Sequence, residues 1–316
     1  MHRYLARRLV QLVPTVFLVS VLVYAMHRFL PGDTITVLMG EMGGAGNADQ
    51  DRIAEILGLH KSGPEGYFAW LSGLIRGDLG ISILSRTPIA DEIFWRWPVT
   101  IELALFALVL VALVGIPIGV IAALRQETPI DYLLRSMAVL GLSLPGFWIA
   151  VMIVTFASIY LCVLPRYDYV GLFDDPLANL KVMWLPASIL AIQYIARVAR
   201  MMRGTLLEVL RQDYIRTAWA KGLKERVVVT RHALKNSMIP VVTLLGLEFT
   251  TMMAGTVVIE RIFDLPGIGS YTLRALGFRD YPTVQSVIFL YALAVMVGNV
   301  LVDFSYRLLD PRVRYQ

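Results

Sequence analysis

Hydrophobic residues in this chain form long, nearly uncharged runs separated by short polar segments. There are six such runs, and a helix needs about 20 apolar residues to cross a hydrocarbon core of about 30 Å. They lie at 9–30, 99–124, 134–163, 184–198 with an extension to 202, 239–259 and 284–308. This pattern predicts an all-α, polytopic membrane protein with six transmembrane helices.

The polar segments divide the chain further. Residues 1–30 are predicted to hold the N-terminus and the first helix, which is too long for a signal peptide and lacks a small-residue cleavage site after it. Residues 31–98 turn polar and contain short helical patterns, which predicts a small, mostly helical external subdomain between helices 1 and 2. Residues 99–316 are predicted to form a five-helix core with a polar loop at 204–238.

Charge is distributed unequally between alternate loops. One set holds 18 Lys and Arg against 6 Asp and Glu, and the other holds 11 against 15. The first set is the N-terminus, the loop near 125–135, the loop at 197–235 and the C-terminal tail. Because Lys and Arg are enriched on the cytoplasmic side of membranes, we expect both termini and the 204–238 loop to be cytoplasmic.

Composition excludes several classes of protein. A hydrophobic content of 57% with 17% charged residues is typical of an integral membrane protein, not a soluble domain. The single Cys162 and four scattered histidines lack the spacing of a metal site, and neither a phosphate-binding loop nor a catalytic constellation is found. We therefore expect no catalytic residue, metal or cofactor in this chain. The net charge of +5 follows from membrane topology, so no nucleic acid is expected as a partner.

The most basic stretch runs from Arg211 to Pro240. Good helix formers lie on both sides of Gly222, which predicts a helix, a turn at the glycine and a second helix. Such a compact helical segment is suited to docking on a cytoplasmic partner.

This stretch resembles the "EAA" loop of ABC importer permeases. It has Arg216 where that family often has Glu and Lys235 where it often has Pro, and both departures match the peptide/nickel branch. In the family this loop presses a short coupling helix into a groove on the ATPase subunit. The residues to which the resemblance assigns this role are Arg216, Thr217, Ala218, Ala220, Lys221, Gly222 and Leu223.

Other strings along the chain resemble the same branch, so the resemblance covers essentially the whole sequence. They are Pro31-Gly32-Asp33, Leu57-Gly58-Leu59, the stretches 77–82, 141–148, 260–271 and 280–285, and the terminal 310–315. The resemblance implies a multi-pass inner-membrane subunit that works by alternating access. Its implied partners are a second homologous permease, two cytoplasmic ATPases that bind ATP and Mg, an external solute-binding protein and the lipid bilayer.

The resemblance leaves the substrate open. Di- or oligopeptides are the commonest expectation, while nickel chelates, glutathione and other small solutes use the same branch. A self-contained secondary transporter or channel is the alternative from another class. It would require several ionisable residues deep in the membrane, and only Glu248 lies deep in a predicted span.

Glu248 lies about midway along its predicted span, where an unpaired carboxylate is costly. It either faces a translocation path, where it would meet water or a substrate amine, or is hydrogen-bonded to a neighbouring helix or subunit. Both alternatives stay open at this point.

Several more charged residues have structural interpretations. Asp303 and Arg307 have the i, i+4 spacing of an ion pair, and Glu102 is expected at the external interface. Three arginines at 197, 200 and 203 are expected to extend toward lipid head groups as their helix leaves the membrane.

Overall fold

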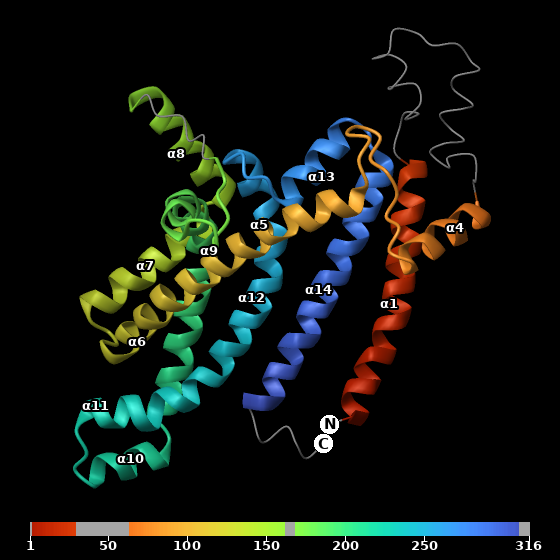
Figure 1. Cartoon of the computed structure of the whole chain (residues 1–316). Helices are drawn as coiled ribbons and strands as arrows, with labels where there is room; N and C mark the ends of the chain where they lie inside the picture. Colours follow the sequence, from red (N-terminus) through yellow and green to blue (C-terminus); the bar gives the residue numbers. More distant parts are fainter. Residues whose placement is uncertain (1, 30–62, 162–167, 310–316) are drawn as a thin grey trace, which may run out of the picture. The chain divides into compact units, whose positions relative to one another are not determined.

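The computed structural model describes residues 2–29, 63–161 and 168–309, and these ranges are helical apart from turns and short connections (Figure 1). Within them the only β feature is an isolated antiparallel bridge between Ile81 and Pro88. The predicted all-α class is confirmed for this part of the chain. Its elements are α1 (His2–Phe29), α4 (Pro64–Ile75), α5 (Ile89–Leu110), η1 (Val111–Gly115), α6 (Ile116–Leu124), α7 (Pro129–Ser143), α8 (Gly146–Tyr160), α9 (Pro176–Leu210), α10 (Asp213–Ala220), α11 (Glu225–Val227), η2 (Val228–Ala233), α12 (Leu234–Ile262), α13 (Ile268–Gly277) and α14 (Tyr281–Leu309), where η marks a π-helix.

Several helices are long and apolar enough to cross a membrane. In the described ranges four stretches qualify, namely Ile89–Leu124, Pro176–Leu210, Glu225–Ile262 and Tyr281–Val300. The bent pair α7 and α8 would make a fifth, and Val10–Met26 in α1 is a shorter apolar helix. The chain is thus polytopic by length and composition, and the total of six spans stays a prediction.

The run at 134–163 is not one straight helix. Helices α7 and α8 meet at 88° at a break around Leu144 and Pro145, both of which are extended. Proline has no N–H to donate and disfavours a helical residue before it, so the helix ends at Ser143. Gln193 of α9 donates its Nε2 to the carbonyl of Leu144 at 2.8 Å. This bond satisfies a carbonyl that the break removes from helical pairing.

Helix α9 extends beyond the predicted span in both directions. At its start the carboxylate of Asp175 accepts hydrogen bonds from the backbone N–H of Leu177 at 3.0 Å and Ala178 at 3.1 Å, and Pro176 occupies the first helical position. These are strong helix-starting features. The C-terminal extension to Leu210 is amphipathic, so a hydropathy pattern does not include it.

The chain forms two compact units. The first comprises Met1–Pro98 with Pro266–Val297, and the second comprises Val99–Leu265 with Gly298–Gln316. Each unit therefore combines segments that are distant in the sequence. An external position of residues 31–98 stays a prediction, and residues 30–62 lie outside the described ranges.

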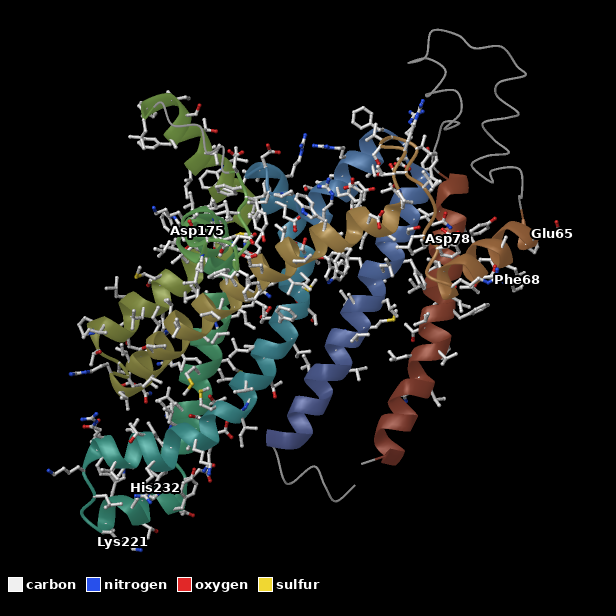
Figure 2. The ribbon with its side chains drawn as sticks, in the orientation of Figure 1. Glu65, Phe68, Asp78, Asp175, Lys221 and His232 are labelled. Atoms are coloured by element: carbon white, nitrogen blue, oxygen red, sulfur yellow. The ribbon has the colours of Figure 1, made fainter. Side chains whose placement is uncertain are left out.

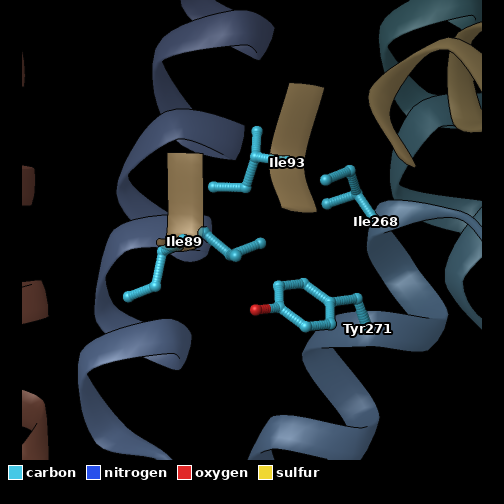
Figure 3. Close-up of a cluster of buried hydrophobic side chains, with 5 residues drawn as sticks. Ile89, Ile93, Ile268 and Tyr271 are labelled. Atoms are coloured by element: carbon cyan, nitrogen blue, oxygen red, sulfur yellow. The ribbon is translucent and has the colours of Figure 1, made fainter. Parts of the chain in front are cut away.

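The first unit has a small apolar core built from three helices. Ile89 and Ile93 of α5, Ile268 and Tyr271 of α13 and Val287 of α14 are buried against one another (Figure 3). Burial in a desolvated site raises the pKa of the Tyr271 phenol, so this side chain stays neutral.

A buried carboxylate connects two of the family-like strings in this unit. Asp280 is 1% exposed and accepts hydrogen bonds from the hydroxyls of Ser82 at 2.5 Å and Thr283 at 2.8 Å. The backbone N–H of Leu84 donates to the same carboxylate at 3.3 Å. Because Asp280 also precedes α14, it fixes the loop at 82–84 to the start of that helix.

Helix α9 is the centre of the second unit, where it contacts α6, α7, α12 and η1. The approach of α6 is very close, since a Cβ on Gly119 would lie 2.6 Å from the carbonyl oxygen of Ala199. A Cβ on Gly115 would lie 3.1 Å from the carbonyl oxygen of Ile195. Small residues four apart permit this contact between backbones.

Candidate functional site

Residues 213–233 form a helical hairpin made of α10, a turn, α11 and η2 (Figure 1). The turn is at Gly222, which has a φ of 75°, a left-handed conformation that favours glycine. The N–H of Gly222 donates to the carbonyl of Trp219 at 2.9 Å, and the N–H of Leu223 donates to that of Ala218 at 3.4 Å. The predicted order of helix, glycine turn and helix is therefore present.

The hairpin has an inner and an outer side. Ile215 and Ala218 of α10 are buried, as are Val228, Val229 and Ala233 of η2, against which α10 packs. Most of the predicted coupling residues lie on the outer side, and Figure 2 labels Lys221 there. Arg216, Thr217, Ala220, Lys221 and Gly222 are exposed, and Leu223 is half-buried.

Ala218 does not lie on the outer surface. It is 6% exposed and faces the interior of the hairpin, so its small side chain permits the packing of α10 on η2. A direct contact of Ala218 with a docked partner is therefore not supported. Two aromatic residues that the sequence interpretation did not include, Tyr214 at 42% and Trp219 at 45% exposure, lie on the outer surface instead.

The hairpin is connected to both long helices of the second unit. It follows α9 in the chain and continues through η2 into α12. The phenol of Tyr214 accepts a hydrogen bond from Nδ2 of Asn236 in α12 at 2.8 Å. Helix α10 is thus linked to α12 both through the chain and through a side-chain contact.

Glu248 is buried in α12 and bonded to α9. Its two carboxylate oxygens accept from Nη1 of Arg197 at 2.9 and 3.3 Å. The Glu248 side chain is 6% exposed, whereas that of Arg197 is 43% exposed. The Glu248 carboxylate is therefore bonded to a neighbouring helix, which is one of the two alternatives that the sequence left open. Its partner, the Arg197 guanidinium, is partly exposed.

The ion pair gives Arg197 a protein partner, Glu248, where the sequence suggested lipid head groups. Helix α9 continues for 13 residues after Arg197, to Leu210, which is about 20 Å at 1.5 Å per residue. Glu248 is a similar distance from the start of α12 at Leu234. The pair thus lies well inside both helices.

Arg203 is also held in an ion pair. Its Nε and Nη2 donate to the two oxygens of Asp131 at 2.8 and 2.7 Å, and the Asp131 side chain is fully buried. This two-bond contact ties the start of α7 to α9. Among the described residues, Arg197 and Arg203 have ion-pair partners, whereas Arg200 is exposed without one, and its contact with lipid head groups stays a prediction.

Sequence reasoning missed Asp131. A local signal existed, because Thr128 and Pro129 begin a helix and an acidic residue in its first turn is favourable. The identity of the partner, 72 residues away, has no local signal.

Glu102 is partly buried in a hydrogen-bonded network near the start of α9. It accepts a hydrogen bond from the Tyr169 hydroxyl at 2.7 Å and another from Nδ2 of Asn179. Burial and the bond to Glu102 raise the pKa of Tyr169, so the phenol keeps its proton. The side chains of Asp303 and Arg307, and Cys162 itself, lie outside the described residues.

Two known protein families match this chain along its length. Residues 115–315 match the family described as "Binding-protein-dependent transport system inner membrane component", and residues 1–104 match its N-terminal family, "Binding-prot-dependent transport system membrane comp, N-term". The chain belongs to this family of permeases. Membership places it among inner-membrane components of bacterial transport systems that depend on a binding protein.

Relatives match this permease over its whole length. The dipeptide transport system permease protein DppB of Escherichia coli (strain K12) is 36% identical over 339 residues, which cover 100% of both chains. The di/tripeptide transport system permease protein DppB of Pseudomonas aeruginosa (strain UCBPP-PA14) is 38% identical with the same coverage.

A solved structure shares the fold of the permease. Inward-facing MetNI, a methionine ABC transporter, superimposes with a TM-score of 0.54 at 15% identity, covering 67% of this chain and 93% of that one. The match supports the helical architecture of an ABC transporter permease.

Proposed function

We propose that this permease moves di- or oligopeptides across the inner membrane as the membrane-embedded subunit of an ATP-driven importer. The observation that carries this proposal is the full-length identity of 36 to 38% with two permeases named for dipeptide and di/tripeptide transport. The match in length and the family strings along the chain support the same kind of transporter for this chain.

The hairpin at 213–233 is the proposed contact with the ATPase. It presents an exposed basic and aromatic surface, and its interior is fixed by buried apolar residues. In the proposed assembly the permease pairs with a second homologous permease, two cytoplasmic ATPases that bind ATP and Mg, and an external binding protein. Six spans, cytoplasmic termini and a cytoplasmic hairpin belong to the same proposal.

The mechanism follows from the way the hairpin joins α9 to α12. ATP binding brings the ATPases together and displaces the hairpin, and this displacement moves both helices because each continues directly from it. The pair of Arg197 and Glu248 connects the same two helices about 20 Å further on. ATP and the loaded binding protein supply the free energy, since a ligand of equal affinity for both states shifts nothing.

Uptake in cells tests this function. A strain that lacks the chromosomal copy of the gene is complemented with the wild-type chain or with Gly222→Val, and entry of radiolabelled Ala-Ala and of ⁶³Ni²⁺ is measured. We expect Ala-Ala uptake only with the wild type. Nickel uptake without peptide uptake would refute peptide transport, and equal peptide uptake with both chains would refute the role of the hairpin.

A further inference from the structure

The guanidinium of Arg197 is fixed on two sides and exposed on a third. Nη1 donates to both oxygens of Glu248, and the guanidinium carbon lies 5.0 Å from the centre of the Tyr194 ring. Glu248 and Tyr194 are both buried, whereas the Arg197 side chain is 43% exposed. The cation is therefore held in one orientation before any ligand arrives.

Only part of its hydrogen-bonding capacity is used. An arginine has five N–H donors in a planar fork, and Glu248 accepts only from Nη1. Among the residues that the structure describes, none accepts a hydrogen bond from Nε or Nη2. These two atoms form one of the edges through which arginine binds a carboxylate with two parallel hydrogen bonds.

At the location of Arg197, hydrogen-bond donors on Nε and Nη2 without an acceptor are costly. Arg197 lies within a helix that is long and apolar enough to cross a membrane, and about 20 Å from its end at Leu210. Unsatisfied donors in such a setting are unfavourable, so the edge must face water or an anionic group. An ionisable residue inside a span most often marks a substrate or ion pathway.

We propose that the Nε–Nη2 edge of Arg197 binds the C-terminal carboxylate of the transported peptide. This inference rests on the proposed function, because it names the chemical group that the translocation path recognises. Glu248 and Tyr194 are positioning residues, which hold the guanidinium in place but leave its second edge open. Arginine suits this role better than lysine, since an ammonium is a point charge without a fork.

The test measures binding directly, in the absence of the binding protein. The assembled transporter is purified with its co-purifying subunits and placed in phosphatidylcholine nanodiscs, and the affinities for Ala-Ala and Ala-Ala-amide are compared. Loss of a charge-assisted, two-bond contact should weaken binding by about tenfold or more. We expect the wild type to prefer Ala-Ala by that factor, and Arg197→Gln and Arg197→Lys to reduce the preference.

Arg200→Gln is the matched control, because it removes the same charge from an exposed position one turn further along α9. It should retain the preference. Equal affinities of the wild type for acid and amide would overturn the proposal, and this comparison does not depend on any variant folding. Loss of the preference in Arg200→Gln to the same extent as in Arg197→Gln would also overturn it.

Two further measurements distinguish peptide binding from lipid binding and from a failure of the proposed function. If phosphatidylglycerol in the nanodiscs weakens Ala-Ala binding to the wild type but not to Arg197→Gln, the edge binds lipid phosphate and the proposal fails. Uptake of Ala-Ala by wild-type cells is measured in parallel. No uptake refutes the proposed function itself, whereas uptake with equal affinities for acid and amide refutes only this inference.

Discussion

Replacing Gly222 tests whether the hairpin acts through its backbone conformation or through a docked surface. The residue has a φ of 75°, and a Cβ built on it meets no atom of the chain within 4 Å. A larger side chain therefore causes no clash within this chain. Its cost must come from the left-handed backbone conformation or from contact with a partner.

The conformational cost can be graded by substitution. Asn tolerates the left-handed region, Ala costs about 1 kcal/mol there, and a β-branched Val costs about 1–2 kcal/mol or more. A penalty of 1–2 kcal/mol changes a local equilibrium by about 5- to 30-fold. If the backbone conformation at position 222 determines coupling, uptake should be highest with Gly222→Asn, close to the wild type, lower with Gly222→Ala and lowest with Gly222→Val.

The assay is Ala-Ala uptake together with ATPase activity stimulated by the loaded binding protein, both normalised to assembled complex. Gly77→Val is a matched control, since Gly77 has a φ of 82° and an equally open Cβ position but lies in the other unit. We expect uptake to be lost with Gly222→Val and kept with Gly77→Val. Normal uptake and normal ATPase stimulation in Gly222→Val would refute a coupling role, and equal losses with Asn and Val would show that size at a docked surface decides.

Other predictions follow from the ion pairs and the topology. Asp131→Ala should lower the yield of assembled complex in size-exclusion chromatography, because removal of one partner of a buried pair costs about 3–5 kcal/mol. The control Asp213→Ala breaks only an exposed pair and should leave the yield unchanged, so equal yields of the two variants would contradict this prediction. Glu248→Gln keeps an acceptor for Arg197 but removes the charge, so uptake per complex should fall severalfold at normal yield, and unchanged uptake would argue against a place in the path. In a cysteine-free background, a cysteine at the 97% exposed Phe173 should react with an impermeant thiol reagent in intact cells and one at Thr230 should not, and labelling of position 230 would reverse the proposed orientation.

Local chemistry explains which parts of the site could be predicted. Gly222 marks a turn because the left-handed conformation is nearly specific to glycine, and this signal needs no knowledge of distant residues. Ala218 had no such signal, since a small side chain fits both a docked surface and a tightly packed interior. Its burial depends on how α10 lies against η2, which the sequence of α10 alone does not determine.

Contacts between distant residues explain the main differences. The arginines at 197 and 203 are paired with acidic residues 51 and 72 positions away, so their helix face alone suggested lipid head groups. Hydropathy also underestimated the length of α9, because the last turns of this helix are amphipathic. Pro145 indicated a break, but the 88° bend and the bond from Gln193 to Leu144 depend on packing against α9.

The contact of Gly119 with α9 also limits how the second unit can move. Backbone atoms at this point are already within the distance that a single added methyl group would occupy. Neither helix can approach further, and separation would lose the van der Waals contacts that close packing at small residues provides. In a transport cycle α6 and α9 should therefore travel as one rigid body, so that spin labels placed on this pair keep a constant distance while labels elsewhere report the change of state.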